Sequence, residues 1–343
     1  MVRDSRQIGI SETEGIGEEF HSALNAAVLI DRSLVGKLRV TGADGPDLLH
    51  RLSTNDLVRL KPFTATGTVF TTDKGRIVDF VRILSLNDSL LLVTSPSLEE
   101  RLKIWIDKYT IMEDIRVTDI TSGFAMYSIV GPKANVVGEE LFQCSLVQDR
   151  ISTVQFAGTD LIVGLESSFA TDRVNILAPR EQAAVVWDRL KLEMKAPAYR
   201  VMGEMTYESF RVFQGIPRES CELTDDFNPY EVGLWPWISS TKGCYIGQEV
   251  IARIDTYDKV QREPIRISFA EHLPYGSGKL SLGINGADVG FLTSFAGVPV
   301  NGEYFGIGVV RRNRIAVGST LVVSAAHMKF KGVVTKVFSR TNR

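Results

Sequence analysis

The stretch GTVFTTDKGRIVDFVRIL, residues 67–84, predicts a pair of antiparallel strands. Apolar and β-branched residues fill both halves, and the polar segment between them contains Gly75, which can adopt the positive φ that a tight turn requires. A third strand-like run at 89–94 follows an Asn-Asp turn. We therefore expect a three-stranded antiparallel meander at the centre of one domain.

Helices are expected on both sides of this meander. Apolar residues at helical spacing predict a helix over 98–109, and Ser97 with Glu100 has the spacing of a capping box at its start. Before the meander, alternating residues at 36–40 predict a strand, and a turn at 42–46 leads into a short helix that uses Leu48, Leu49 and Leu52. This order of elements is typical of an α+β domain.

The two ends of the chain differ in character. Residues 1–20 mix glutamates with glycines, so we expect a loose lead-in there and no helix. Beyond Pro264, short strand-like runs at even spacing are separated by turns that contain Gly or Asn, as in a small β-barrel. The predicted fold class is therefore α+β with a C-terminal β-barrel.

Composition narrows the classes of function. The chain of 343 residues is 44% hydrophobic and 23% charged, with a formal charge of -2, so no nucleic-acid partner is expected. The three cysteines include no close pair, and no apolar run approaches the ~18 residues of a membrane helix. Neither a phosphate-binding glycine loop nor an H-E-x-x-H motif is present. We expect a soluble, cytoplasmic protein without a membrane partner or a metal site.

Residues 242–249 read KGCYIGQE and form the most unusual segment of the chain. Two glycines flank the thiol of Cys244, and a helical pattern begins directly after Gly247. The free N–H groups of that helix and the ammonium of Lys242 can both stabilise a thiolate, so one interpretation is a nucleophilic or redox-active cysteine. The alternative is a domain linker in which Cys244 is a small buried hydrophobic residue.

Asp79 is the only carboxylate on one face of the strand at 76–84, where its neighbours are isoleucine and valine. Because an isolated buried carboxylate is costly, Asp79 must have a partner. It can hydrogen-bond a polar heterocycle or act as a general base. A structural ion pair with an arginine such as Arg39, or an edge position open to water, is the alternative.

Residues 227–237 are rich in aromatic side chains but show little helical or strand periodicity. Tyr230 and Trp235 can sandwich a flat ring, while ordinary packing between domains is the alternative. Downstream, Arg253 belongs to a basic cluster that can bind the carboxylate tail of a ligand, although most such clusters are simply solvated. The pattern predicts a ligand-binding loop followed by a cationic patch.

Several short segments, taken in order, resemble one known family. They are GKLRVTGAD (36–44), STND (53–56), KGRIVD (74–79), GPKA (131–134) and GIP (215–217). Their order and spacing resemble glycine-cleavage T-proteins over nearly the whole chain. KGCYIGQE is similar to the K-G-C-[FY]-x-G-Q-E signature of the YgfZ-type members of that superfamily, which support iron-sulfur proteins.

The resemblance implies a T-protein-like fold of three domains around a central channel that binds tetrahydrofolate. The expected division is a discontinuous α+β domain of 1–54 plus 119–259, an inserted sheet-and-helix domain of 55–118, and the barrel of 260–343. A reduced folate and iron-sulfur client proteins are the partners that it implies.

The leading function is a tetrahydrofolate-binding accessory protein for assembly or repair of iron-sulfur enzymes. In this hypothesis Cys244 is the reactive group and Lys242 is its electrostatic partner. The folate-binding residues that we expect are Asp79, Tyr230, Trp235 and Arg253.

Two rival functions stay open. The first is a tetrahydrofolate-dependent aminomethyltransferase, and the second is a non-catalytic interaction module that retains the fold. T-proteins carry a second aspartate where this chain has Phe80, and a pterin-binding glutamate where it has Phe213. Phe80 weighs against aminomethyl transfer, and Phe213 is the best support for the interaction module.

Overall fold

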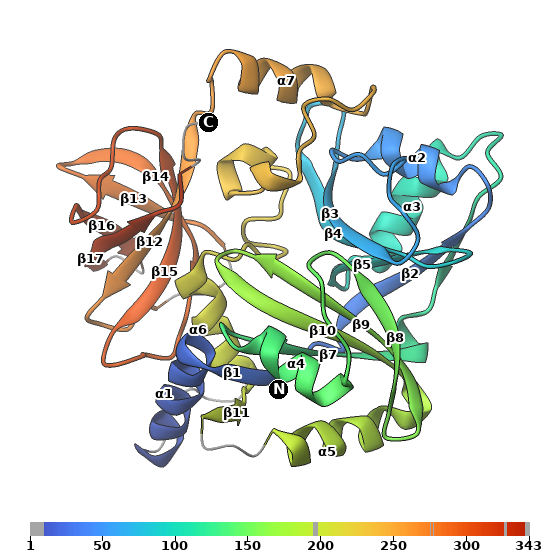
Figure 1. Ribbon diagram of the computed structural model, residues 1–343. Helices are drawn as coiled ribbons and strands as arrows, with labels where there is room; N and C mark the ends of the chain where they lie inside the picture. Colours follow the sequence, from blue (N-terminus) through green and yellow to red (C-terminus); the bar gives the residue numbers. More distant parts are fainter. Residues whose placement is uncertain (1–9, 195–197, 275, 277, 326–327, 340–343) are drawn as a thin grey trace.

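The computed structural model describes residues 10–194, 198–274, 276, 278–325 and 328–339. They form two open sheets and one closed barrel, with helices packed around and between them (Figure 1). The α+β class and the C-terminal barrel that the sequence predicts are both confirmed.

The first sheet has six strands in the order β11-β1-β7-β10-β9-β8. The strands are β1 (Ala27–Asp31), β7 (Phe124–Val130), β8 (Ile151–Phe156), β9 (Thr159–Ser168), β10 (Thr171–Pro179) and β11 (Tyr199–Val201). Helices α4 (Ala134–Phe142) and α5 (Ala183–Glu193) cover its outer face, where alternate apolar residues such as Val174 and Ile176 form one core. The inner face turns toward the second sheet, because Glu166 of β9 contacts Arg82 of β4.

The second sheet has five antiparallel strands in the order β3-β4-β5-β2-β6. The strands are β2 (Val35–Thr41), β3 (Thr64–Thr71), β4 (Ile77–Ser85), β5 (Leu90–Pro96) and β6 (Arg116–Asp119), and η1 (Thr121–Gly123) follows β6. The predicted meander is therefore β3-β4-β5, and Gly75 has a φ of 67° in the turn, as expected. Helices α2 (Gly45–Leu52) and α3 (Glu99–Tyr109) pack on its apolar core.

Strand pairing shows that the second sheet begins at β2, earlier in the chain than the domain boundary near 54 that the sequence predicts. β2 pairs with both β5 and β6, although a boundary near 54 assigns β2 and α2 to the first domain. The sheet units divide near Val35 and Asp119 for this reason. Local patterns show that β2 is a strand, but only its partners show to which sheet it belongs.

The barrel closes in the order β12-β15-β14-β13-β16-β17. Its strands are β12 (Arg262–Phe269), β13 (Leu280–Ile284), β14 (Ala287–Phe295), β15 (Tyr304–Arg311), β16 (Thr320–Ala325) and β17 (Met328–Val337). Between the six-stranded sheet and the barrel lie α1 (Ile10–Asn25) and α6 (Glu204–Gln214). The connection from α6 to the barrel contains η3 (Pro229–Val232), η4 (Trp235–Trp237) and α7 (Gln248–Thr256), and η2 (Arg180–Gln182) precedes α5.

The N-terminal segment differs from the expected loose lead-in. Residues 10–25 form the helix α1, and Ile16, Phe20 and Ala23 are buried on one side of it. These three residues recur at helical spacing, and Phe20 and Ala23 share a core cluster with residues of α6 and the barrel. Tertiary packing therefore overrides the low helix propensity of the glycines.

The capping box predicted before α3 is also wrong. The helix begins at Glu99 with Leu98 as its N-cap, and no side chain caps it. Ser97 instead has a left-handed φ of 60°, which ends β5 sharply.

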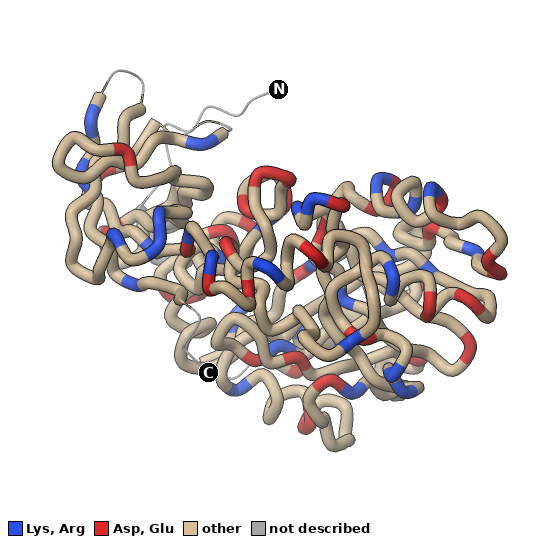
Figure 2. Tube along the Cα trace, turned by 90° about the horizontal axis from the view of Figure 1, so that it is seen from above, with Lys and Arg blue, Asp and Glu red and all other residues tan. Residues whose placement is uncertain are grey.

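Charged residues of both signs are interspersed along the trace of the described residues (Figure 2).

Candidate functional site

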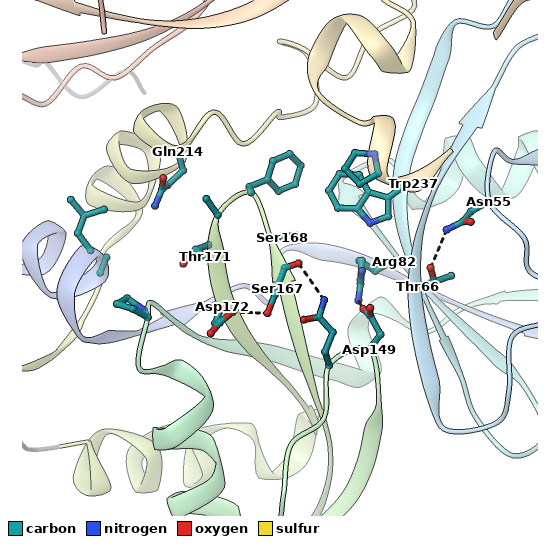
Figure 3. Close-up of a pocket in the computed structure, with 17 residues that line it drawn as sticks. Asn55, Thr66, Arg82, Asp149, Ser167, Ser168, Thr171, Asp172, Gln214 and Trp237 are labelled. Carbon is teal, nitrogen blue, oxygen red and sulfur yellow. Dashed lines mark hydrogen bonds and ion pairs between the residues drawn. The ribbon is translucent and has the colours of Figure 1, made fainter. Parts of the chain in front are cut away.

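A cavity of about 650 Å³ lies where the inner face of the six-stranded sheet meets β3, β4 and η4 (Figure 3). Segments from nine parts of the chain line it. The lining residues are Ala23, Leu24, Asn55, Thr66, Arg82, Pro132, Gln148, Asp149, Ser167, Ser168, Phe169, Ala170, Thr171, Asp172, Gln214, Pro236 and Trp237. The cavity is large enough for a drug-sized organic ligand.

One wall of the cavity is aromatic. Trp237 lies 5.1 Å from Phe169 and 4.6 Å from Phe80, measured between ring centroids. The indole packs directly on β3 at Gly67, where an added Cβ would approach it to 2.3 Å. Only glycine fits there, so Gly67 sets the position of the Trp237 ring.

The Phe169 side of this wall depends on a strained turn. Phe169 and Ala170 join β9 to β10, and both have left-handed φ values, 51° and 59°. Neither is glycine, so each position costs about 1–2 kcal/mol. The packing of Phe169 against Phe80 and Trp237 offsets this cost.

A polar wall adjoins the aromatic one and is ordered by hydrogen bonds (Figure 3). The amide of Asn55 donates to the carbonyl of Gly67 at 2.8 Å and to the hydroxyl of Thr66 at 3.1 Å. Arg82 forms ion pairs with Asp149 at 3.2 Å and with Glu166 at 3.4 Å. Gln148 and Gln214 add amides, so this wall can both donate and accept hydrogen bonds.

Cys244 lies on an exposed loop, which excludes the interpretation of a buried structural cysteine. The loop ends at α7, for which Gly247 is the N-cap with a φ of 82°. A side chain at Gly247 would approach the carbonyl of Thr72 to 2.4 Å, so the loop requires glycine there.

Lys242 anchors this loop and does not form a direct pair with the thiol. Its side chain is buried, and the ammonium donates to the carbonyls of His50, Ser53 and Asn55 at 2.5, 2.6 and 2.8 Å. These three acceptors use all three of its N–H groups. Burial lowers the pKa of Lys242 to about 7, and the charge of Asp56 opposes this shift.

Asn55 connects the cysteine loop to the cavity. Its side chain lines the cavity, while its carbonyl accepts the hydrogen bond from Lys242. Thr54 adds a second connection, because its hydroxyl donates to the carbonyl of Trp237 at 2.8 Å and its carbonyl accepts from the Ser239 N–H. The segment 53–55 therefore supports both regions.

Asp79, which we expected to contact folate, does not line the cavity. Its side chain is 1% exposed and faces away from Phe80 and Arg82, which project toward the six-stranded sheet. The carboxylate accepts hydrogen bonds from the hydroxyl of Ser95 at 2.6 Å and from the N–H groups of Ser95 and Phe80. Its partner is therefore β5, and neither a ligand nor Arg39 is needed to explain its burial.

The other three expected folate residues also lie away from the cavity. Tyr230 and Trp235 pack in a small cluster with Tyr245 and Ile251, next to α7. Arg253 is exposed on α7. The aromatic segment 227–237 does reach the cavity, but through Pro236 and Trp237.

The two positions where T-proteins carry carboxylates differ in their surroundings. Phe80 belongs to the aromatic cluster behind the cavity wall. Phe213 lies between Phe20 and Phe305 beneath the guanidinium of Arg266, and its neighbour Gln214 lines the cavity. Sequence reasoning missed Gln214, because only the packing of α6 against the sheet brings its side chain to the cavity.

Neither a metal site nor a membrane-spanning helix is found among the described residues. No group of three or more His, Cys, Asp and Glu side chains is arranged there to hold a metal ion. No helix in the same part of the chain is long and apolar enough to cross a bilayer.

The fold and the site define a class of protein with two sheets, a C-terminal barrel and an aromatic-walled polar cavity beside a cysteine loop. The family model described as the GCVT N-terminal domain matches residues 10–242. The chain therefore belongs to the GCVT family of the glycine-cleavage T-protein.

Individual relatives agree with this assignment. A chloroplastic protein of Arabidopsis thaliana named as a transferase, At1g60990, is 30% identical over 317 residues, which is 91% of this chain and 71% of that protein. The aminomethyltransferase of Halalkalibacterium halodurans is 24% identical over 329 residues, 94% of this chain and 88% of the relative. The crystal structure of glycine cleavage system aminomethyltransferase T from Bartonella henselae has the same fold, with a TM-score of 0.77, 17% identity, and coverage of 94% of this chain and 88% of that one.

Proposed function

We propose that this protein binds a reduced folate in the 650 Å³ cavity and acts through Cys244 as an accessory factor for iron-sulfur enzymes. The observation that carries the proposal is the shared segment 53–55. It positions Asn55 in the cavity and also holds, through Lys242, the loop that exposes Cys244. The residues that bind a ligand in the cavity and the loop that presents the thiol would therefore both depend on segment 53–55.

The cavity suits the pterin ring of a folate. Trp237 and Phe169 offer aromatic faces for stacking, and the amides of Gln148 and Gln214 can pair with ring nitrogens and a carbonyl oxygen. Tetrahydrofolate would supply a one-carbon carrier at this position. The residues of the chain orient the ring and exclude water from it.

The role in iron-sulfur chemistry rests on the resemblance of KGCYIGQE to the YgfZ-type signature and on the exposure of Cys244. An exposed thiol can reach a damaged cluster on a client protein. The described residues offer the thiols Cys144, Cys221 and Cys244, whereas a bound cluster normally has about four thiolate-type ligands. A client protein would therefore hold the cluster.

The rival function is tetrahydrofolate-dependent aminomethyl transfer, because several relatives carry that name. Its catalytic carboxylate would have to come from the cavity. The two carboxylates in the lining are already engaged, Asp149 with Arg82 and Asp172 with the hydroxyl of Ser167. Phe80, at the T-protein aspartate position, offers no proton acceptor.

Calorimetry with tetrahydrofolate and its 5-formyl derivative tests the ligand proposal. Trp237→Ala should weaken binding at least about tenfold, because an aromatic contact and its buried area are lost. Trp235→Ala is the matched control, since Trp235 lies two residues away and outside the cavity. If no reduced folate binds or stabilises the wild-type protein at millimolar concentration, the folate proposal is wrong.

A second arm tests the cysteine. Cells that lack the gene and are restored with Cys244→Ala should stay deficient in iron-sulfur enzyme activities, while Cys144→Ser restores them. Full restoration by Cys244→Ala would contradict the proposed mechanism. Transfer of an aminomethyl group from a carrier by the purified protein would favour the rival.

A further inference from the structure

Arg32 and Arg173 place two guanidinium groups on the inner face of the six-stranded sheet. On β10, Val174 and Ile176 point into the core beneath α4 and α5, so Arg173 points the opposite way. Directly after β1, Arg32 continues the alternation of the inner-face residues, and it reaches Tyr207 of α6. Both side chains therefore face the space between the sheet, α6 and β4.

The carboxylate nearest to Arg173 already has other partners. Glu166 is the cross-strand neighbour of Arg173, but its oxygens accept hydrogen bonds from Ser168 at 2.7 Å and Asn175 at 3.2 Å. Arg82 forms an ion pair with the same carboxylate at 3.4 Å. The Nε atom of Arg173 is buried and has no hydrogen-bond partner among the described residues.

Arg32 is also left without a carboxylate partner within ion-pair distance in the described part of the chain. Its guanidinium lies over the ring of Tyr207, 4.6 Å from the centroid, and donates a hydrogen bond to the hydroxyl of that tyrosine. Glu219 faces it from the loop after α6, but no ion pair joins the two side chains. A neutral phenol does not compensate the charge of Arg32.

The electrostatics of the two residues agree with this excess of positive charge. Burial and the charge of Arg173 lower the pKa of Arg32 to about 9, against the opposing effects of Glu219 and Glu166. Burial likewise lowers the pKa of Arg173; the charge of Glu166 opposes that shift, and the charge of Arg82 adds to it. An anion placed between these groups would remove the repulsion and satisfy the free donors.

We propose that Arg32 and Arg173 form a binding site for an oxyanion, a carboxylate or a phosphate group, on the inner face of the six-stranded sheet. Planar guanidinium groups bind both kinds of anion with paired hydrogen bonds. The site adjoins the cavity, because Thr171 and Asp172, directly before Arg173, line it. The anion is either the charged end of a ligand in the cavity or a free ion, and the site does not depend on which heterocycle binds.

Thermal unfolding in inorganic phosphate or glutarate, with chloride at matched ionic strength, tests this site. The wild-type protein should gain several degrees in Tm at millimolar anion, because a ligand of the native state stabilises it. Arg173→Met and Arg32→Met should each lose most of that gain. Arg253→Met, which removes an exposed arginine of α7, is the control and should respond as the wild type does.

The stability of the variants without anion separates binding from a structural role. If Arg173 is an uncompensated cation, Arg173→Met without anion should be at least as stable as the wild type. A large loss of stability with an unchanged anion response would show that Arg173 is a structural partner of Glu166, and the proposal would be wrong. Arg32→Met gives the same comparison if Arg173→Met does not fold.

The source of the anion is decided by a further comparison. If the glutamate tail of a folate is the anion, Arg173→Met should weaken binding of the folate and leave binding of the pterin without that tail unchanged. If a free ion is the natural ligand, phosphate should stabilise the wild type while folate binding is the same in both proteins. Absence of any response to phosphate, glutarate and the folate tail in the wild type would overturn the proposal, whether or not the pterin binds.

Discussion

At the scale of single residues, Asp79 shows that a buried carboxylate on a strand can have a structural role instead of binding a ligand. Sequence pattern alone made it a candidate ligand contact, yet its hydrogen bonds with Ser95 and Phe80 tie β4 to β5 inside one sheet. Burial raises the pKa of Asp79 to about 7, although these hydrogen bonds oppose the shift. Near neutral pH the native state therefore still binds a proton that the unfolded chain has released.

The pKa of Asp79 predicts how stability depends on pH. Because the native pKa lies above the unfolded value, this proton stabilises the native state fully below about pH 4, and the contribution disappears as pH rises through 7. The total is at most about 4 kcal/mol. Urea unfolding of the wild type between pH 4 and 8 should show this decline, and Asp79→Asn should show less of it. An identical pH profile in the two proteins would contradict the pKa of about 7.

At the scale of elements, the Lys242 side chain anchors the middle of the loop at 239–247, whose ends are held by hydrogen bonds of Ser239 and Ile246. Lys242 connects it to the end of α2 and to Asn55 through three carbonyl groups, and its ammonium lies 4.8 Å from the centre of the Tyr245 ring. The electrostatic effect of Lys242 on the Cys244 thiolate stays a prediction. The three carbonyl contacts also give Lys242 a positioning role.

Lys242→Met should therefore loosen the loop, because three buried carbonyls lose their donor. We expect amide hydrogen exchange at 239–247 to rise at least tenfold, while the pH profile of Cys244 alkylation keeps its wild-type shape. Lys242→Arg should restore part of the protection. The opposite pattern, in which the profile moves by a full pH unit and exchange does not change, would support the electrostatic role.

At the scale of the whole molecule, a buried polar network joins α6 to the barrel. Arg211 is 2% exposed and donates to the hydroxyl of Ser294 on β14 at 2.9 Å and to the carboxylate of Glu208. Glu222 is 1% exposed and accepts from Thr293 and Ser294, 3.6 Å from Arg211. The barrel is therefore held against α6 by a buried network in which Arg211 and Glu222 are each other's counter-charge.

Arg211→Met should cost about 3–5 kcal/mol in the free energy of unfolding, because Glu222 would remain buried without its counter-charge. Adding Glu222→Gln should recover part of the loss. Arg218→Met, which removes an exposed partner of Glu208, should change stability by less than about 1 kcal/mol. Equal effects of Arg211→Met and Arg218→Met in urea unfolding would show that the network does not hold the barrel.

Much of the fold was predictable because it depends on local periodicity. The alternating strands around Gly75, the short strands after Pro264 and the glycine-bounded cysteine loop are all visible in the sequence. The helix α1 was missed because three buried residues, and not propensity, stabilise it. The sheet to which β2 belongs was missed because its partners lie far along the chain.

The sequence by itself therefore determined the family and the class of fold, and it showed that Cys244 lies between two glycines, whereas its exposure came from the structure. Only the tertiary structure decided which side chains form the cavity, because Asn55, Arg82, Phe169 and Trp237 come together from distant segments. It also decided the partners of Asp79 and Lys242. A local pattern shows the face of a strand on which a charge lies, but the energy of that charge depends on the donors and acceptors that folding brings to it.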